Sequence, residues 1–164
     1  MGLKNLFKKS AKAAKSFDFY MPITGALLPL EKVPDPVFSE KMMGDGFAIE
    51  PTEGKVYAPI AGTVFSIFPT KHAIALKTHD DLEILIHFGI DTVALGGVGF
   101  TIHIEKDQPI TPGELLLEVN IEAVKTQVPS LITPIIFTNL NQSTIQLKKN
   151  GHLVHGEGDI LEIK

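Results

Sequence analysis

The sequence predicts an all-β protein: an antiparallel β-sandwich of short strands with one or two short helical turns. Three observations support this fold class. The 164 residues suffice for one domain with a sizeable core. The 11 prolines and 14 glycines interrupt the chain often, at the spacing of about ten residues that is typical of sandwich strands. β-branched residues fill the intervals, which favours strands over long helices.

Two segments, residues 21–30 and 58–67, share one pattern in which Pro and Gly stand three apart and an apolar run follows. A partial third copy begins at Thr133. Proline is tolerated at the first position of a strand because its missing N–H leaves no gap in the ladder there. The pattern therefore predicts strands of a sandwich.

The second half of the chain contains the one internal segment that we expect to be helical, residues 120–127, with Asn120 as its N-cap. Residues 128–139 and 143–147 are predicted strands. Residues 149–151, Lys-Asn-Gly, are predicted to form a hairpin turn that leads into a closing segment ending at Lys164.

A second predicted hairpin, residues 68–93, carries three of the six histidines: His72, His87 and, in its turn, His79. If its loop has two residues (His79 and Asp80) or four (78–81), His72 lies directly opposite His87, with Cβ atoms about 4.5–5.5 Å apart. A loop of three or five residues shifts the register by one and sends the two rings to opposite faces. The expectation of paired imidazoles depends on this register.

Both faces of this hairpin are largely apolar, and only one of them can face the main core. An apolar surface around two polar rings suits the docking of a partner, whereas two half-buried core histidines are the simpler alternative. In the predicted register the histidine face carries Ile74, Leu76 and Leu85, and the other face carries Ala73, Ala75, Leu82, Ile84 and Ile86.

The connection formed by residues 33–46 is unusually apolar for a loop, since it contains Val37, Phe38, Met42 and Met43. Exposed apolar loops often bind partners, and methionine adapts to several partner shapes. A short helical turn that closes one end of the sandwich explains the same residues. The sequence leaves both interpretations open.

Charge divides the chain into a basic tail, residues 1–17, and a predicted domain, residues 18–164. The tail has five lysines and no acid, and Leu3, Leu6, Phe7, Ala11 and Ala14 stand near helical spacing. Such a segment can lie on an anionic membrane surface, and the alternative is a solvated tail. The remainder has 10 lysines against 19 acidic residues, a net charge of −9.

The composition excludes several function classes. The chain has no arginine, and its body is acidic, which argues against nucleic acid and suits a basic protein partner. It has no cysteine, hence no disulfide, thiolate nucleophile or cysteine-ligated zinc. No apolar run reaches the roughly 18 residues of a membrane span and no signal peptide is present, so we expect a cytoplasmic protein.

Two facing imidazoles suit two kinds of chemistry. In the first, a neutral imidazole nitrogen attacks phosphorus while the second ring hydrogen-bonds the transferred phosphoryl oxygens, and Thr70 is placed to orient His72. In the second, both rings bind zinc, which needs further ligands. A zinc hydrolase is thus a weaker alternative. The chain has no Gly-x-Ser-x-Gly elbow and no phosphate-binding loop.

Four motifs resemble those of a known family, in the same order: residues 33–46, 69–73, 83–93 and Thr133-Pro134. The sequence 83–93, Glu-Ile-Leu-Ile-His-Phe-Gly-Ile-Asp-Thr-Val, is similar to the active-site signature of the glucose-family enzyme IIA of the bacterial phosphoenolpyruvate-dependent sugar phosphotransferase system. The resemblance covers residues 18–164, and this family has an antiparallel β-sandwich fold.

The resemblance implies a phosphotransferase that carries a phosphoryl group on a histidine in sugar uptake. His87 would accept the group from the phosphocarrier protein HPr and pass it to a cysteine of a IIB domain. His72 would support this onward transfer, and the Thr70 hydroxyl would orient the His72 ring. The resemblance also implies a surface that binds the partners, formed by Asp35, Phe38, Met42, Met43, Phe68, Leu85, Asp91 and Val93. We add Val37, which belongs to the same apolar connection.

The resemblance requires no cofactor, although His72 and His87 could share a zinc ion with a carboxylate from a bound protein. It also admits regulated transporters or kinases as further partners. The alternative from another class is a non-catalytic regulatory module that docks partners through the apolar face around the two histidines.

Overall fold

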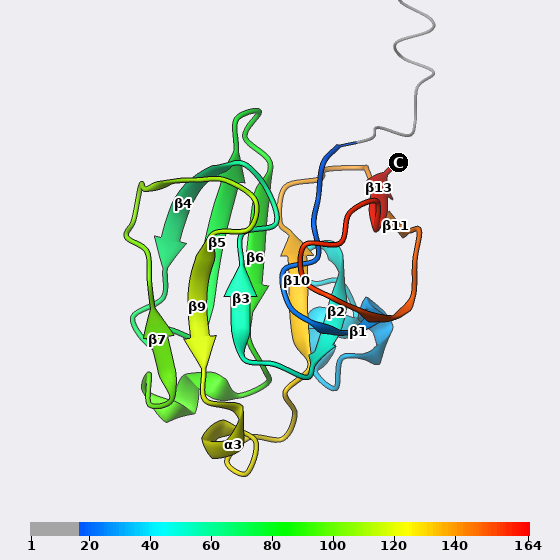
Figure 1. Cartoon of the computed structure of the whole chain (residues 1–164). Coiled ribbons are helices and arrows are strands. Elements are labelled where there is room, and N and C mark those ends of the chain that lie inside the picture. The colour runs from blue at the N-terminus through cyan, green and yellow to red at the C-terminus, as the bar shows by residue number, and fades with distance from the viewer. Residues whose placement is uncertain (1–16) are drawn as a thin grey trace, which may run out of the picture.

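The computed structural model describes residues 17–164, so the predicted basic tail lies outside the described residues except for Phe17. Every strand pairing within these residues is antiparallel, and the helices are short (Figure 1). The predicted all-β fold class is confirmed. None of the helices in residues 17–164 has the length and apolar content needed to cross a membrane.

Three sheets make up the described part of the chain. The largest has the strand order β12-β1-β2-β10-β6-β5-β4-β8, a second has the order β3-β9-β7, and β11 pairs with β13 in a third. Figure 1 shows the β3-β9-β7 sheet lying across part of the large sheet. The strands are β1 (Gly25–Pro29), β2 (Asp45–Pro51), β3 (Lys55–Tyr57), β4 (Gly62–Ile67), β5 (Ala73–Thr78), β6 (Glu83–His87), β7 (Phe100–Ile102), β8 (Pro109–Ile110), β9 (Leu115–Val119), β10 (Thr133–Phe137), β11 (Ile145–Leu147), β12 (Gly151–Leu153) and β13 (Leu161–Ile163).

The main core lies between the large sheet and the β3-β9-β7 sheet. Ile74 and Ile86 of the large sheet and Val56 and Leu117 of the smaller one belong to one buried cluster. A second, smaller cluster lies apart from it and contains Leu30, Val33, Phe38, Ala48, Ala73, Leu85, Ile90 and Ile136. The central strands of the large sheet therefore bury apolar side chains on both faces.

The two segments that share the Pro-Gly pattern do form equivalent strand starts. Gly25 opens β1 and Gly62 opens β4. A Cβ atom at Gly25 would lie 2.2 Å from the Glu50 carbonyl oxygen, and one at Gly62 would lie 2.0 Å from the Lys77 carbonyl oxygen. Only glycine allows the neighbouring strand to approach so closely.

The predicted register of the β5–β6 hairpin is wrong by one residue. Ala73, not His72, pairs with His87, and the Thr78 N–H donates to the Leu82 carbonyl at 2.9 Å. The loop thus has three residues, 79–81, and Asp81 adopts a left-handed conformation with φ of 67°. Three-residue hairpin loops commonly end in such a left-handed residue.

The shifted register exchanges the predicted faces of the first strand, while Leu85, Ile84 and Ile86 of the second strand lie on the faces that we predicted. Ile74 belongs to the main core with Ile84 and Ile86, whereas Ala73 and Leu85 belong to the second cluster. Ile74 and Leu76 therefore face away from His87, and Ala73 and Ala75 lie on its side. The period of two along a strand makes every side chain change face when the register moves by one.

Short helices occupy two predicted places. The helix α3 (Ile121–Val124) is capped by Asn120, whose side chain accepts from the Ala123 N–H, as expected. The apolar connection contains the 3-10 helix η1 (Leu30–Lys32) and the helix α2 (Pro36–Ser39), where Asp35 is the N-cap and Phe38 is buried. Another 3-10 helix, η2 (Thr92–Leu95), follows β6.

The C-terminal pairing differs from the prediction. Residues 149–151 do not join two paired strands, because β11 pairs with β13 while β12 pairs with β1. The partner of β12 is thus more than a hundred residues away in sequence. Turn chemistry at Asn150-Gly151 is local and carries no information about such a distant partner.

Candidate functional site

The rings of His72 and His87 lie side by side, with centroids 4.7 Å apart and planes at 83°. His87 is the last residue of β6, and His72 immediately precedes β5. The predicted pairing of the two rings is therefore present, although the predicted register is not. The reason lies in the turn before β5.

That turn releases His72 from the alternation of the strand. The Lys71 N–H donates to the Phe68 carbonyl at 2.8 Å, and Lys71 is left-handed with φ of 63°. The His72 carbonyl still accepts from the Phe88 N–H at 2.8 Å, which holds its backbone beside β6. Because regular β geometry begins only at Ala73, the side chain of residue 72 can turn to the face of His87.

Backbone contacts define the protonation of His87. Its Nδ1 lies 2.9 Å from the Gly89 carbonyl oxygen. A carbonyl can only accept, so Nδ1 carries the proton in the neutral ring and Nε2 keeps its lone pair. The contact depends on Gly89, whose φ of 74° is a left-handed value that favours glycine.

Two buried threonines hold the loop that carries the Gly89 carbonyl. The Gly89 N–H donates to Thr133 Oγ1 at 3.2 Å, and Thr92 Oγ1 donates to the Phe88 carbonyl at 2.7 Å. Both threonine side chains are fully buried. Sequence analysis gave no role to Gly89 or Thr92 and quoted Thr133 only as part of a motif. One sequence signal could have indicated these threonines: a threonine within an apolar run is expected to be buried, and its buried hydroxyl must then find a hydrogen-bond partner.

His72 has a hydroxyl partner instead of a carbonyl. Thr70 Oγ1 lies 2.7 Å from His72 Nδ1, as the sequence predicted for this pair. When the hydroxyl donates to Nδ1, the neutral ring carries its proton on Nε2 and can donate there. The two rings then offer complementary atoms, a lone pair on His87 and an N–H on His72.

Both rings are held in the neutral form. The pKa of His72 is lowered to about 4, chiefly by burial and next by the neighbouring His87, while a hydrogen bond with the Thr70 backbone acts in the opposite direction. Burial also lowers the pKa of His87, against the hydrogen bond to Gly89 and the charges of Asp35 and Asp91. His72 is only 3% exposed, which explains why desolvation dominates there.

An apolar surface surrounds the two rings. The Phe38 ring centroid lies 5.0 Å from that of His87, and the Phe68 centroid lies 5.6 Å from that of His72. We call the exposed apolar residues among those predicted to bind partners the collar. They are Val37, Met42, Met43, Phe68 and Val93.

Two predicted partner-binding residues, Phe38 and Leu85, are each 5% exposed. They belong to the second cluster and present little surface of their own to a partner. The connection that carries Phe38 thus combines both interpretations of the sequence: a helical turn closes the second cluster, and Met42 and Met43 remain exposed beside it.

The predicted acidic residues lie close enough to act on His87, because the charges of Asp35 and Asp91 both raise its pKa. Asp35 also caps α2, where its Oδ1 accepts from the Val37 N–H at 3.0 Å. Asp91 has a φ of 60° and precedes η2. The Asp35 carboxylate therefore combines a capping role with a charge that acts on His87, whereas the Asp91 carboxylate makes no capping hydrogen bond.

Metal-ligating side chains are few around the pair. In residues 17–164 no three His, Cys, Asp or Glu side chains come together as a metal site. The two imidazoles alone can supply two ligands, and zinc requires at least three from protein. Any zinc ion held here would need a ligand from another molecule.

An antiparallel sandwich with a neutral imidazole pair inside an apolar collar defines a class, that of the all-β phosphoryl-carrier domains. A family model described as "phosphoenolpyruvate-dependent sugar phosphotransferase system, EIIA 1" matches residues 17–143. The chain belongs to this family. The resemblance inferred from the sequence motifs is thereby confirmed.

Similar proteins agree with this assignment. The chain is 42% identical over 161 residues to the "PTS system glucose-specific EIIA component" of Staphylococcus aureus (strain COL), which covers 98% of this chain and 97% of that protein. The protein of the same description from Staphylococcus epidermidis (strain ATCC 12228 / FDA PCI 1200) has the same identity and coverage. The solved structure "glucose permease IIA from Mycoplasma capricolum" has a TM-score of 0.84 and 40% identity, covering 91% of this chain and 96% of that one.

Proposed function

We propose that this protein carries a phosphoryl group on His87 between two partner proteins in sugar uptake. The observation that carries the proposal is the arrangement of the ring pair. His87 Nδ1 donates to a backbone carbonyl, which leaves Nε2 as a nucleophile, and a second imidazole lies beside it. Both rings have lowered pKa values, so both are neutral at neutral pH.

In the first step His87 accepts the group from phosphorylated HPr. The Nε2 lone pair forms a bond to phosphorus while the bond from phosphorus to HPr breaks, and the electron pair of that bond stays with HPr. His72 Nε2–H donates to a transferred phosphoryl oxygen, where negative charge is concentrated. The Thr70 hydroxyl keeps that proton on Nε2 by donating to Nδ1.

In the second step the group leaves for a cysteine of a IIB domain. The cysteine thiolate attacks phosphorus, the bond from phosphorus to His87 Nε2 breaks, and its electron pair returns to the ring as a lone pair. His87 ends in the state in which it began. The Gly89 carbonyl holds Nδ1–H throughout, so ring orientation and tautomer need no resetting between cycles.

The surface around the rings suits two partners that bind in turn. The collar gives apolar contact area, and Met42 at 69% exposure adapts readily to different shapes. Asp35 and Asp91 add negative charge beside the rings, which favours a basic partner such as HPr. Because the similar proteins are described as glucose-specific, we propose a IIB domain of a glucose permease as the acceptor.

Phosphorylation of the full chain tests the proposal. We expect incubation with phosphoenolpyruvate, enzyme I and HPr to yield acid-labile, base-stable phosphate, and His87→Gln to remove it entirely. His72→Gln should retain labelling by HPr and lose onward transfer to a IIB domain. His103→Gln is the matched control, since His103 pairs with Glu118 away from the ring pair. Label that persists in His87→Gln would overturn the nucleophile assignment.

The ring pair also offers two nitrogen ligands for a zinc ion shared with a carboxylate of a bound protein. We propose this as a second use of the site, because residues 17–164 contain no third donor beside the pair. Equilibrium dialysis of the isolated chain should then find no stoichiometric zinc. Stoichiometric zinc in the isolated chain would contradict the shared site and favour the hydrolase alternative.

Family membership supports a cytoplasmic location, which we propose for this carrier. Membrane contact through residues 1–17 and binding of regulated transporters or kinases stay predictions. Sedimentation with vesicles of anionic lipid measures the first, and affinity capture with the unphosphorylated and phosphorylated chain measures the second.

A further inference from the structure

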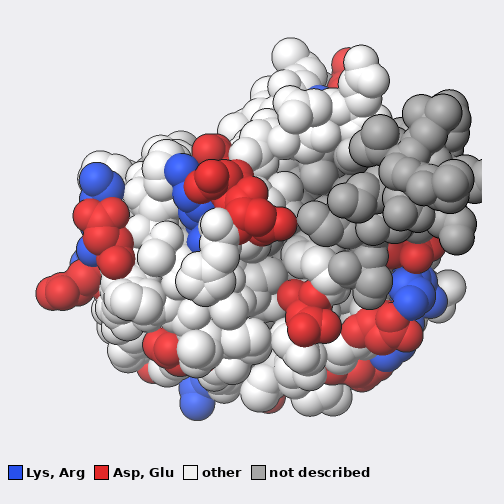
Figure 2. Space-filling view, turned by 90° about the horizontal axis from the view of Figure 1, so that it is seen from above, with Lys and Arg blue, Asp and Glu red and all other residues white. Residues whose placement is uncertain are grey.

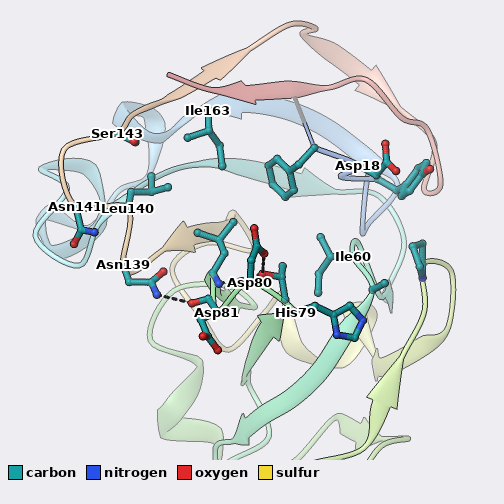
Figure 3. A pocket seen from close by; sticks show the side chains of 16 residues that line it. Asp18, Ile60, His79, Asp80, Asp81, Asn139, Leu140, Asn141, Ser143 and Ile163 are labelled. Carbon is teal, nitrogen blue, oxygen red and sulfur yellow. Dashed lines mark hydrogen bonds between the residues drawn. The ribbon is translucent and has the colours of Figure 1, made fainter. Parts of the chain in front are cut away.

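A second site lies at the other end of the β5–β6 hairpin from the histidines. The hairpin loop, residues 79–81, forms part of a pocket of about 740 Å³. Figure 3 shows side chains from several distant segments of the chain turned toward this space, with Asn139 hydrogen-bonded to Asp81. From His72 to Thr78 the strand covers roughly 20 Å, so the pocket does not overlap the ring pair.

The pocket combines an apolar wall with an acidic one. Among residues 17–164, those that line it include three aspartates and no lysine or arginine. Figure 2 looks down on this end of the molecule and shows acidic side chains set in largely uncharged surface. The apolar wall is formed by Phe17, Tyr20, Ile60, Leu82, Leu140 and Ile163, and the aspartates are Asp18, Asp80 and Asp81. A lining of this kind suits a ligand with an apolar side, which meets the apolar wall, and positive charges, which meet the aspartates.

The chain itself contains such a segment, and it ends at the pocket. Residues 1–16 carry five lysines and no acid, with an apolar stripe at helical spacing. The next residue, Phe17, is part of the apolar wall. Its ring packs 6.0 Å from that of Phe19 and 6.2 Å from that of Phe137, which fixes the point where the segment joins the described chain.

Because the segment is covalently joined to the pocket, its effective concentration there is high, and this also favours binding. A flexible link of a few residues gives an effective concentration of about a millimolar or more. Weak apolar contacts and charge attraction therefore suffice for occupancy.

We infer that residues 1–16 bind the pocket of their own chain, with the apolar stripe against the apolar wall and the lysines beside the three aspartates. This inference goes beyond the proposed phosphoryl transfer and does not depend on it. While the segment occupies the pocket, the collar around His72 and His87 stays open to HPr and IIB.

Paramagnetic relaxation on the full chain tests the inference. The chain has no cysteine, so Ser10→Cys accepts a single nitroxide label. We expect selective broadening of the backbone amides of residues 78–82 and 139–143, in the absence of lipid and independent of protein concentration. Amides around His72 and His87 should be much less affected.

Matched variants separate docking from general charge effects. Asp81→Lys should reduce the broadening several-fold, whereas Asp107→Lys should leave it unchanged. The two sites match, because Asp81 and Asp107 are both exposed and have φ of 67° and 68°, values that Lys41 and Lys71 also adopt in this chain. Phe7→Ser, which removes one apolar side chain of the segment, should also reduce the broadening.

Three results would overturn the inference. Broadening spread evenly over the surface would mean that the segment has no site. Broadening that grows with protein concentration would assign the pocket to the segment of a second copy. Absence of broadening, together with binding of the labelled segment to vesicles of anionic lipid, would make the segment a membrane anchor only. Phosphorylation of His87 should be unaffected by Phe7→Ser, so this test and that of the proposed function fail separately.

Discussion

The two ends of the β5–β6 hairpin place their titratable side chains in opposite environments, one buried and one exposed to solvent. At one end His72 and His87 are buried or half-buried, their pKa values are lowered, and backbone or hydroxyl partners hold each ring. At the other end Asp80 and Asp81 are exposed around an open pocket. Desolvation keeps the two rings neutral, whereas exposed carboxylates attract cations. The comparison predicts large effects at the ring end and small ones at the pocket end.

The largest effect is expected from Gly89→Ala. An alanine there must adopt φ of 74°, and its Cβ would lie 2.8 Å from Thr92 Cγ2 and 3.2 Å from the Ser130 carbonyl oxygen. We expect a loss of about 2–4 kcal/mol in the free energy of unfolding and much slower phosphorylation, because the carbonyl that orients His87 moves. Urea denaturation and the phosphorylation assay measure the two losses.

Gly96→Ala is the control for this strain, since Gly96 has φ of 60° and open space where a Cβ would lie. This substitution should lower the free energy of unfolding by only about 1 kcal/mol and leave the phosphorylation of His87 intact. Equal costs at the two glycines would show that the contacts around Gly89 do not constrain its loop.

The pH dependence of stability should be the next largest effect. The folded protein holds the pKa of His72 at about 4 against 6.5 for an ordinary histidine, so it binds fewer protons than the unfolded chain between these values. The free energy of unfolding should therefore fall as the pH drops from 6.5 to 4, by on the order of 2–3 kcal/mol, with no contribution from this group above pH 6.5.

His72→Gln should remove most of this pH dependence, because glutamine does not titrate. Urea denaturation of both proteins at a series of pH values measures it, and NMR titration of the ring C–H signals locates the pKa directly. A His72 ring that titrates near 6.5 would contradict the claim that burial dominates at this end of the hairpin.

A smaller effect is expected from Thr70→Val, which removes the hydroxyl that lies 2.7 Å from His72 Nδ1. Loss of this contact leaves the proton free to occupy Nδ1, where it cannot reach the phosphoryl group. A hydrogen bond between neutral groups is worth about 0.5–1.5 kcal/mol, which corresponds to roughly 2- to 13-fold slower onward transfer. Rapid-quench measurement of transfer to a IIB domain tests it, with Thr101→Val on β7 as the control.

The smallest effect should come from Asn139→Ala at the pocket end. Asn139 accepts from the Glu83 N–H at 2.8 Å and donates to the Asp81 carbonyl at 2.7 Å, but the site is exposed and water can replace both bonds. We expect a loss of about 1 kcal/mol in unfolding free energy and an unchanged rate of His87 phosphorylation. A change in that rate would show that the two ends of the hairpin are coupled.

Local patterns were enough to predict much of this molecule. The Pro-Gly pattern before β1 and β4, the Asn120 cap of α3 and the Asp-rich turn between β5 and β6 all depend on residues near one another in sequence. The family motifs are likewise short and continuous. They identified His72, His87 and Thr70, which the structure brings together.

The predictions failed where an answer depended on conformation that short patterns leave open. The left-handed Asp81 makes the loop three residues long and moves the register, and the turn at Lys71 then returns the His72 side chain to His87. The turn at Lys71 thus compensates for the shifted register, and the two rings lie together as predicted. Turn propensities alone favour two-, three- and four-residue loops too equally to decide the register.

By itself, then, the sequence determined the fold class, the identity of the paired histidines and the family, because these rest on composition and on contiguous motifs. Only the tertiary structure decided which tautomer each ring adopts, which threonines hold the His87 loop, that β12 pairs with β1, and that an acidic pocket lies where the basic segment ends. Each of these depends on groups far apart in sequence, whose approach is set by the packing of the whole sandwich.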